Sequence, residues 1–232
     1  MFRELISIFR HSDPLREMGD NFAQMLKITH DTIVKAGDIY FGQEVSSGER
    51  TWIYKQDIKV NELERTIRQQ LITHLAVAAN AAYLPYCLLL MSLVKDVERI
   101  GDYAKNLSEV ADFHAGPPPE GAIERELREI RAGVEAALAE TADVFQKSDT
   151  DRAVQLIRTT KDIARRCDQL VEMVARSDFR AGVAAAAVLG ARYYKRIGGH
   201  ALNVLSGVVM PLHKLDYFDE DDLPDNVLET LH

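Results

Sequence analysis

The chain has few cysteines and no long apolar run. Its 232 residues contain 2 cysteines, and Cys87 and Cys167 lack the paired spacing found in zinc sites and disulfide scaffolds. We therefore expect both thiols to be reduced and buried. The most apolar stretch, 81–94, contains Pro85 and is shorter than the roughly 20 residues that a membrane-spanning helix needs. It is predicted to be a core helix instead.

Basic residues are fewer than acidic ones, 28 against 36. The net charge is -8 and the sequence pI is about 5.4, whereas a nucleic-acid-binding protein needs a concentrated basic face. We expect no nucleic-acid partner. The opening segment MFRELISIFR lacks the long apolar region of a secretory signal, which favours a cytoplasmic protein. This segment is expected to pack onto its own bundle, and contact with a membrane surface or a partner is the alternative.

Motifs of common catalytic sites are missing from the sequence. It contains neither a P-loop nor the Gly-x-Ser-x-Gly turn of a serine nucleophile. Di-iron carboxylate bundles use paired Glu-x-x-His elements, and here that spacing falls on Glu229 and His232 at the end of the chain. We therefore expect the protein not to be an enzyme.

Helical periodicity covers most of the chain. Apolar residues at steps of three and four predict helices at about 13–41, 51–79, 82–113, 123–147, 153–176 and 179–209. Strand-like alternation is essentially missing, and the segment HAGPPPEG separates the first three helices from the last three. The predicted fold class is all-α, a tandem repeat of two antiparallel three-helix bundles.

The predicted organisation has four parts. Residues 1–113 form the first three-helix repeat, 114–122 a Pro/Gly linker, 123–210 the second repeat and 211–232 an acidic tail. We expect the tail to be solvated, and a docking peptide for a basic partner is the alternative. Small residues such as Gly190 and Gly198 in the last helix predict tight packing inside the bundle, and a homodimer seam is the alternative.

An internal repeat supports the duplication. ERIGDYAKN at 98–106 and KRIGGHALN at 195–203 agree at five of nine positions. Each copy lies in the third helix of its half, so duplication of a three-helix unit explains both the pattern and its spacing.

Polar residues spaced by four line one side of two helices. These pairs are Glu98 with Asp102 and Asp57 with Asn61. Such a spacing places both side chains on one helix face, so the two carboxylates of the third helix could bind one hard cation, with an oxygen from the second helix completing the site. The alternative is a solvated acidic face with Arg99 and Lys105 as partial counterions.

The chain resembles the PhoU family of phosphate-uptake regulators. The likeness rests on ERIGDYAKN, its degenerate copy KRIGGHALN, and DIKVNELE at 57–64. It implies a cytoplasmic adaptor that works with a phosphate transporter and a sensor histidine kinase, associates with the membrane through these partners, and has no turnover chemistry. It also implies iron or zinc bound by E/D-x-x-x-D motifs, which Glu98 and Asp102 match fully and which Asp57 and Asn61 match in part.

The second copy departs from this motif. Lys195 and Gly199 stand where the first copy has its two carboxylates, and Asp168 on the preceding helix has Ala164 four residues before it. We therefore expect any metal to bind to the first repeat only. Three other functions stay open: a metal-dependent carboxylate-bundle enzyme, a metal-binding helical scaffold, and a helical scaffold that binds no metal.

Overall fold

The computed structural model describes residues 13–42, 47–78, 81–112 and 120–215, and every regular element within these ranges is helical. The long helices are α2 (Asp13–Tyr40), α3 (Ser47–Ala78), α4 (Leu84–Glu109), α5 (Ala122–Lys147), α6 (Thr150–Ala175) and α7 (Ala181–Val209). Three short 3-10 turns are η1 (Ala81–Tyr83), η2 (Val110–Asp112) and η3 (Leu212–Lys214). The all-α prediction is confirmed.

Local signals place several helix ends. Ser148 adopts the left-handed conformation with φ 52° and ends α5, which confirms the predicted break. The Asp149 side chain then accepts a hydrogen bond from the backbone N–H of Arg152 at 3.0 Å. This cap starts α6 at Thr150, three residues before the predicted start at 153. Pro85 lies in the first turn of α4, where its missing N–H costs no hydrogen bond.

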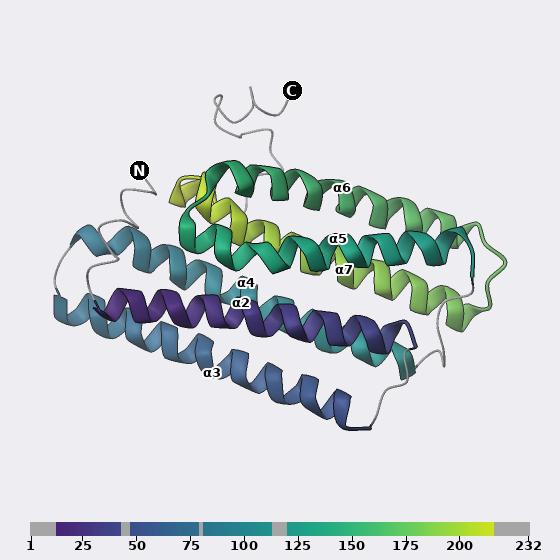
Figure 1. Cartoon of the computed structure of the whole chain (residues 1–232), viewed down its shortest axis with the longest axis horizontal. Helices are drawn as coiled ribbons and strands as arrows, with labels where there is room; N and C mark the ends of the chain where they lie inside the picture. The colour runs from purple at the N-terminus through teal and green to yellow at the C-terminus, as the bar shows by residue number, and fades with distance from the viewer. Residues whose placement is uncertain (1–12, 43–46, 79–80, 113–119, 216–232) are drawn as a thin grey trace.

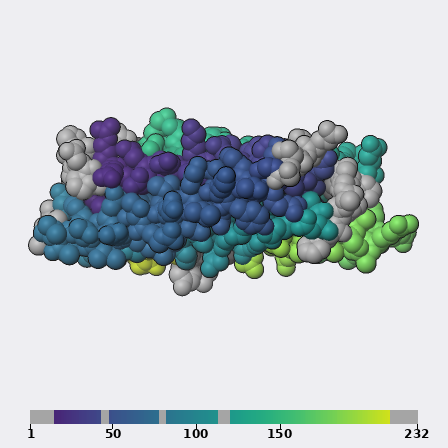
Figure 2. Space-filling model, turned by 90° about the horizontal axis from the view of Figure 1, so that it is seen from below, coloured from purple at the N-terminus to yellow at the C-terminus, as the bar shows by residue number. Residues whose placement is uncertain are grey.

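The six helices form two bundles that lie against each other (Figure 1). Helices α2, α3 and α4 pack together, as do α5, α6 and α7, and the contacts of α4 with α7 and of α2 with α5 join the two sets. The tandem of three-helix bundles is therefore confirmed. Figure 2 shows the elongated shape of the molecule, with α3 along the face toward the viewer.

The core is continuous between the repeats. The ring of Phe22 on α2 packs against that of Phe145 on α5, with centroids 4.8 Å apart. Both side chains are buried, as are the free thiols of Cys87 and Cys167. The prediction of reduced, buried cysteines is confirmed. None of the helices in the described ranges is both long and apolar enough to cross a membrane.

The small residues of α7 admit side chains from the first repeat. The ring of buried Tyr40 lies directly over Gly190, and its hydroxyl donates a hydrogen bond to the carbonyl of Ala186 at 3.1 Å. Tight packing inside the molecule is thus confirmed at this glycine, while the homodimer stays a prediction.

Three predicted segments lie wholly or largely outside the described residues. They are the amphipathic opening segment, most of the Pro/Gly linker and the acidic tail beyond Leu215. Leu215 is buried and packs near Gly207 of α7, and Leu212 also packs against the core, so these side chains of the predicted tail belong to the bundle.

Candidate functional site

Asp57 of α3 and Asp102 of α4 both contact the amine of Lys105. The Lys105 Nζ atom lies 3.2 Å from Asp57 Oδ2 and 3.1 Å from Asp102 Oδ1, and all three side chains are partly buried. Burial by itself would lower the Lys105 pKa, but the hydrogen bonds to Asp102 and Asp57 outweigh it and the pKa is raised. Lys105 is therefore cationic at neutral pH and links the two helices.

Glu98 lies one helical turn before Asp102 on α4. Burial raises the pKa of the Glu98 carboxyl, and the negative charges of Asp102, Glu64 and Asp57 raise it further. Arg99 opposes this, because its guanidinium lies 3.7 Å from Glu98 and 3.2 Å from Asp102. The surface between α3 and α4 is therefore an acidic cluster that is partly neutralised by cations of α4.

The predicted metal ligands gather only in part. Asp57 and Asp102 meet through Lys105, and Glu98 is close enough to interact electrostatically with both. Asn61 is half-buried on α3. Within the described ranges, no three His, Cys, Asp or Glu side chains are placed to hold one metal ion. As they are arranged, the four side chains do not fit a metal ion, because Lys105 contacts two of the carboxylates. Metal binding by these residues stays a prediction.

The second repeat has an ion pair where its motif departs from the first. Lys195 of α7, which replaces Glu98, lies with its Nζ atom 2.6 Å from Asp168 Oδ2 on α6. Arg192 contacts the other oxygen of Asp168 at 3.2 Å. The second and third helices of this repeat are thus joined by the same type of contact as those of the first, a carboxylate with a basic side chain.

A polar contact between the repeats was not predicted from the sequence. Asp96 of α4 is 1% exposed, and its Oδ1 atom lies 2.8 Å from His200 Nδ1 and accepts a hydrogen bond from Asn203 at 2.8 Å. The His200 ring stacks on Tyr103, with centroids 5.7 Å apart. His200 is therefore held by the Asp96 carboxylate and by packing on Tyr103, both residues of the first repeat.

The sequence contained one signal for this contact. Asp96 lies three residues after Leu93 and directly before Val97, beside the apolar seam of α4. A carboxylate at such a position must find partners when the seam packs. The pattern does not show which helix provides them, because periodicity along one helix holds no information about its neighbours.

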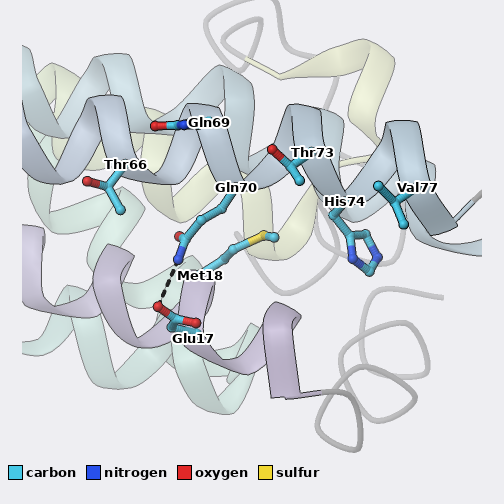
Figure 3. Close-up of a pocket in the computed structure, with 8 residues that line it drawn as sticks. All are labelled: Glu17, Met18, Thr66, Gln69, Gln70, Thr73, His74 and Val77. Carbon is cyan, nitrogen blue, oxygen red and sulfur yellow. Dashed lines mark hydrogen bonds between the residues drawn. The ribbon is translucent and has the colours of Figure 1, made fainter.

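A groove of about 420 Å³ lies between α2 and α3, away from the acidic cluster (Figure 3). Its lining includes Met18 and Val77 together with polar side chains, among which Gln70 donates a hydrogen bond to Glu17 at 2.9 Å. The His74 Nε2 atom is buried and has no hydrogen-bond partner among the residues that the structure describes. The side chains are mostly neutral and do not select one class of ligand.

Among the comparisons with known proteins, the family match falls on the first three-helix repeat. A family model described as PhoU domain matches residues 15–111, which span α2, α3 and α4. A protein of Pseudomonas aeruginosa named phosphate-specific transport system accessory protein PhoU homolog is 30% identical over 173 residues, which cover 72% of this chain and 71% of that protein. A protein of Pseudomonas putida with the same name is 27% identical, with 72% and 67% covered.

Two solved structures share the fold. The crystal structure of PhoU from Pseudomonas aeruginosa superposes with a TM-score of 0.77 at 24% identity, covering 86% of this chain and 97% of that one. The phosphate transport system regulatory protein PhoU from Streptococcus pneumoniae gives a TM-score of 0.73 at 15% identity, with 90% and 97% covered. At such identities the structures support the fold, while the sequence relatives support the family. The 30% identity to the Pseudomonas aeruginosa relative, together with the Arg-Ile-Gly core that recurs on the third helix of each bundle, shows that this chain belongs to the PhoU family.

Proposed function

We propose that this protein regulates a phosphate transport system as an accessory protein of the transporter. The observation that carries the proposal is the 30% identity to a Pseudomonas aeruginosa protein that is named as such an accessory protein. That match extends over most of both chains.

The proposed role is that of a cytoplasmic adaptor rather than an enzyme. The protein would bind a component of the phosphate transporter and a sensor histidine kinase, and would reach the membrane through them. Long rigid helices with exposed apolar side chains, such as Ile58 at 54% and Ile72 at 62% exposure, offer surfaces for partners of this kind.

Co-purification tests the proposal. The full chain is tagged at one end or, separately, at the other, and recovered from cells of its own source grown with abundant or limiting phosphate. We expect both tagged forms to recover a phosphate-transporter component, together with the sensor kinase, in at least one growth condition. Recovery of neither, from cells in which both are detected, would refute the adaptor role. Recovery of the transporter alone would refute only the kinase part.

Metal binding is a separate part of the proposal. Iron or zinc at Glu98, Asp102, Asp57 and Asn61 would require these side chains and Lys105 to rearrange, and would then neutralise the acidic cluster. Elemental analysis of protein purified without chelator and without a metal-affinity tag tests it. A substoichiometric metal content in the wild-type chain and in Glu98→Gln alike would refute it, whereas a stoichiometric content that the substitution lowers is the expected result.

A further inference from the structure

The groove between α2 and α3 lies at the end of the molecule where α2 begins. The two helices are antiparallel (Figure 1), and Gln70 of α3 bonds Glu17 in the first turns of α2. From that contact α2 continues for only about 6 Å to Asp13, whereas α3 continues for about 10 Å to Val77. The last turns of α3 therefore extend past the start of α2, as Figure 3 shows at the labelled Val77.

Apolar surface is exposed at this end of the bundle. The side chain of Val77 is 79% exposed, and Leu84 and Leu88 at the start of α4 are 43% and 45% exposed. The His74 ring packs on Tyr83, with centroids 5.1 Å apart. Its Nε2 atom is buried without a hydrogen-bond partner in the described ranges. A buried polar atom is normally satisfied, so the groove has room for a polar group as well as for apolar side chains.

The residues that directly precede α2 have the pattern of an amphipathic helix. They lie outside the described residues, and their sequence is MFRELISIFRHS. Four large apolar residues stand at the spacing i, i+3, i+4 and i+7, which places them on one helix face; they are Phe2, Leu5, Ile6 and Phe9. Asp13 and Pro14 are a helix-start signal, so a helix over 2–10 would be separate from α2.

This segment matches the groove in position, length and charge. It is joined to α2 beside the groove, and the link to Asp13 gives it a high effective concentration there. A helix over 2–10 is about 12 Å long, and the α3 residues that line the groove, from Thr66 to Val77, span about 16 Å. Arg3 and Arg10 stand seven residues apart and so share one flank of such a helix, while Glu17 is an acidic residue of the lining.

We propose that residues 2–10 form a short helix that folds back before Asp13 and docks its apolar face in the α2–α3 groove of the same chain, over His74 and Val77. A helix of this length is marginal in water by itself, so it forms because its apolar face is buried. The docked helix covers the exposed apolar end of the first repeat. This role goes beyond the regulation of transport and does not depend on it.

Reactivity of an engineered thiol at Val77 tests the docking. Val77→Cys places a small, nearly apolar side chain in the groove lining, and the two native thiols are buried. Ile72→Cys is the matched control, because Ile72 is 62% exposed on the same helix but does not line the groove. Each cysteine variant is made in the full chain, once with the opening segment intact and once with Leu5→Gln and Phe9→Gln. The labelling rate with a maleimide is measured by mass spectrometry.

Docking should protect the thiol in the groove and leave the control unchanged. We expect Val77→Cys to react at least about tenfold more slowly with the intact segment than with the two glutamine substitutions. A tenfold ratio corresponds to about 1.4 kcal/mol of docking free energy. Equal rates for Val77→Cys in the two backgrounds would overturn the proposal. An equal acceleration at Ile72→Cys would overturn it too, because it would show general loosening of α3.

Two other occupants give different results. If the segment of a second copy filled the groove, protection of Val77→Cys would disappear on dilution together with a dimer in size-exclusion chromatography with light scattering, and docking within one chain would be wrong. If the segment bound a membrane instead, the full chain would sediment with phosphatidylglycerol vesicles only when Leu5 and Phe9 are present, and Val77→Cys would react equally fast in both backgrounds without vesicles. That result would also overturn the proposal.

Hydrogen exchange keeps the test decisive without changing the segment. In the unsubstituted full chain, the amides of residues 2–10 should exchange at least about tenfold more slowly than in an unstructured peptide, which again corresponds to about 1.4 kcal/mol. Val77→Gln should reduce this protection, and Ile72→Gln should not. Unprotected amides in the unsubstituted chain, or equal losses in the two variants, would overturn the proposal. Failure of the co-purification experiment would leave these results unchanged, because they concern the purified chain alone.

Discussion

Replacing Gly190 with alanine should destabilise the protein through a single contact between the repeats. A Cβ atom at this position would overlap the hydroxyl and ring carbons of Tyr40, with Cε2 at 2.8 Å. The ring has little room to move, because it is 4% exposed and packs edge-on against Phe41 and Tyr194, with centroids 5.0 and 6.5 Å away.

The magnitude follows from three contributions. Overpacking of a buried site costs about 1–3 kcal/mol, and loss of the hydrogen bond from Tyr40 to the Ala186 carbonyl costs about 0.5–1.5 kcal/mol. Alanine is better than glycine in a helix interior by roughly 0.5–1 kcal/mol, which offsets part of the loss. We expect Gly190→Ala to lower the free energy of unfolding by about 2 kcal/mol, within a summed range of roughly 0.5–4 kcal/mol.

Gly199 provides a matched control on the same helix. An added Cβ there meets no atom within 4 Å, so Gly199→Ala should raise the free energy of unfolding by roughly 0.5–1 kcal/mol. Urea unfolding followed by circular dichroism gives both values. Equal changes in the two variants would refute the reasoning. In a Tyr40→Leu background the ring is gone, so Gly190→Ala should lower the free energy of unfolding by less. An undiminished cost in that background would also refute the reasoning.

Three further predictions concern buried groups. Asp96→Ala removes the acceptor of His200 in the other repeat and should cost about 1.5–3 kcal/mol in urea unfolding, and an unchanged midpoint would contradict the assigned contact. Burial raises the pKa of the Glu135 carboxyl above its ordinary value of 4.5, so its contribution to stability is present below that pH and is lost as pH rises through the folded pKa. Glu135→Gln should therefore gain melting temperature relative to the wild type between pH 4 and neutral pH, and a constant difference would argue against the burial effect. Burial also raises the pKa of the Cys167 thiol to about 12, and iodoacetamide at pH 8 should label neither Cys167 nor Cys87 until denaturant is added, as mass spectrometry of the native chain would show.

Helix patterns predicted most of the framework but left ambiguities within it. The apolar spacing of α3 fits either Ile58 or Val60 in the core, and the structure buries Val60 and leaves Ile58 exposed. Two positions correspond to about 200° around a helix, so these side chains lie on nearly opposite sides of α3 and only one of them can face the core. The packing of α3 against α2 and α4 fixes the rotation of α3, and with it the side of the helix on which Asp57 meets Lys105.

The sequence by itself determined the six helices, their duplication and the acidic stripe on the third helix, because each is a regularity that recurs along one segment. The tertiary structure decided which groups meet. It placed Lys105 between Asp57 and Asp102, His200 on Asp96, and Tyr40 over Gly190. These contacts depend on the relative rotation and register of neighbouring helices, which the packing of all six helices sets together and which no periodicity within a single helix contains.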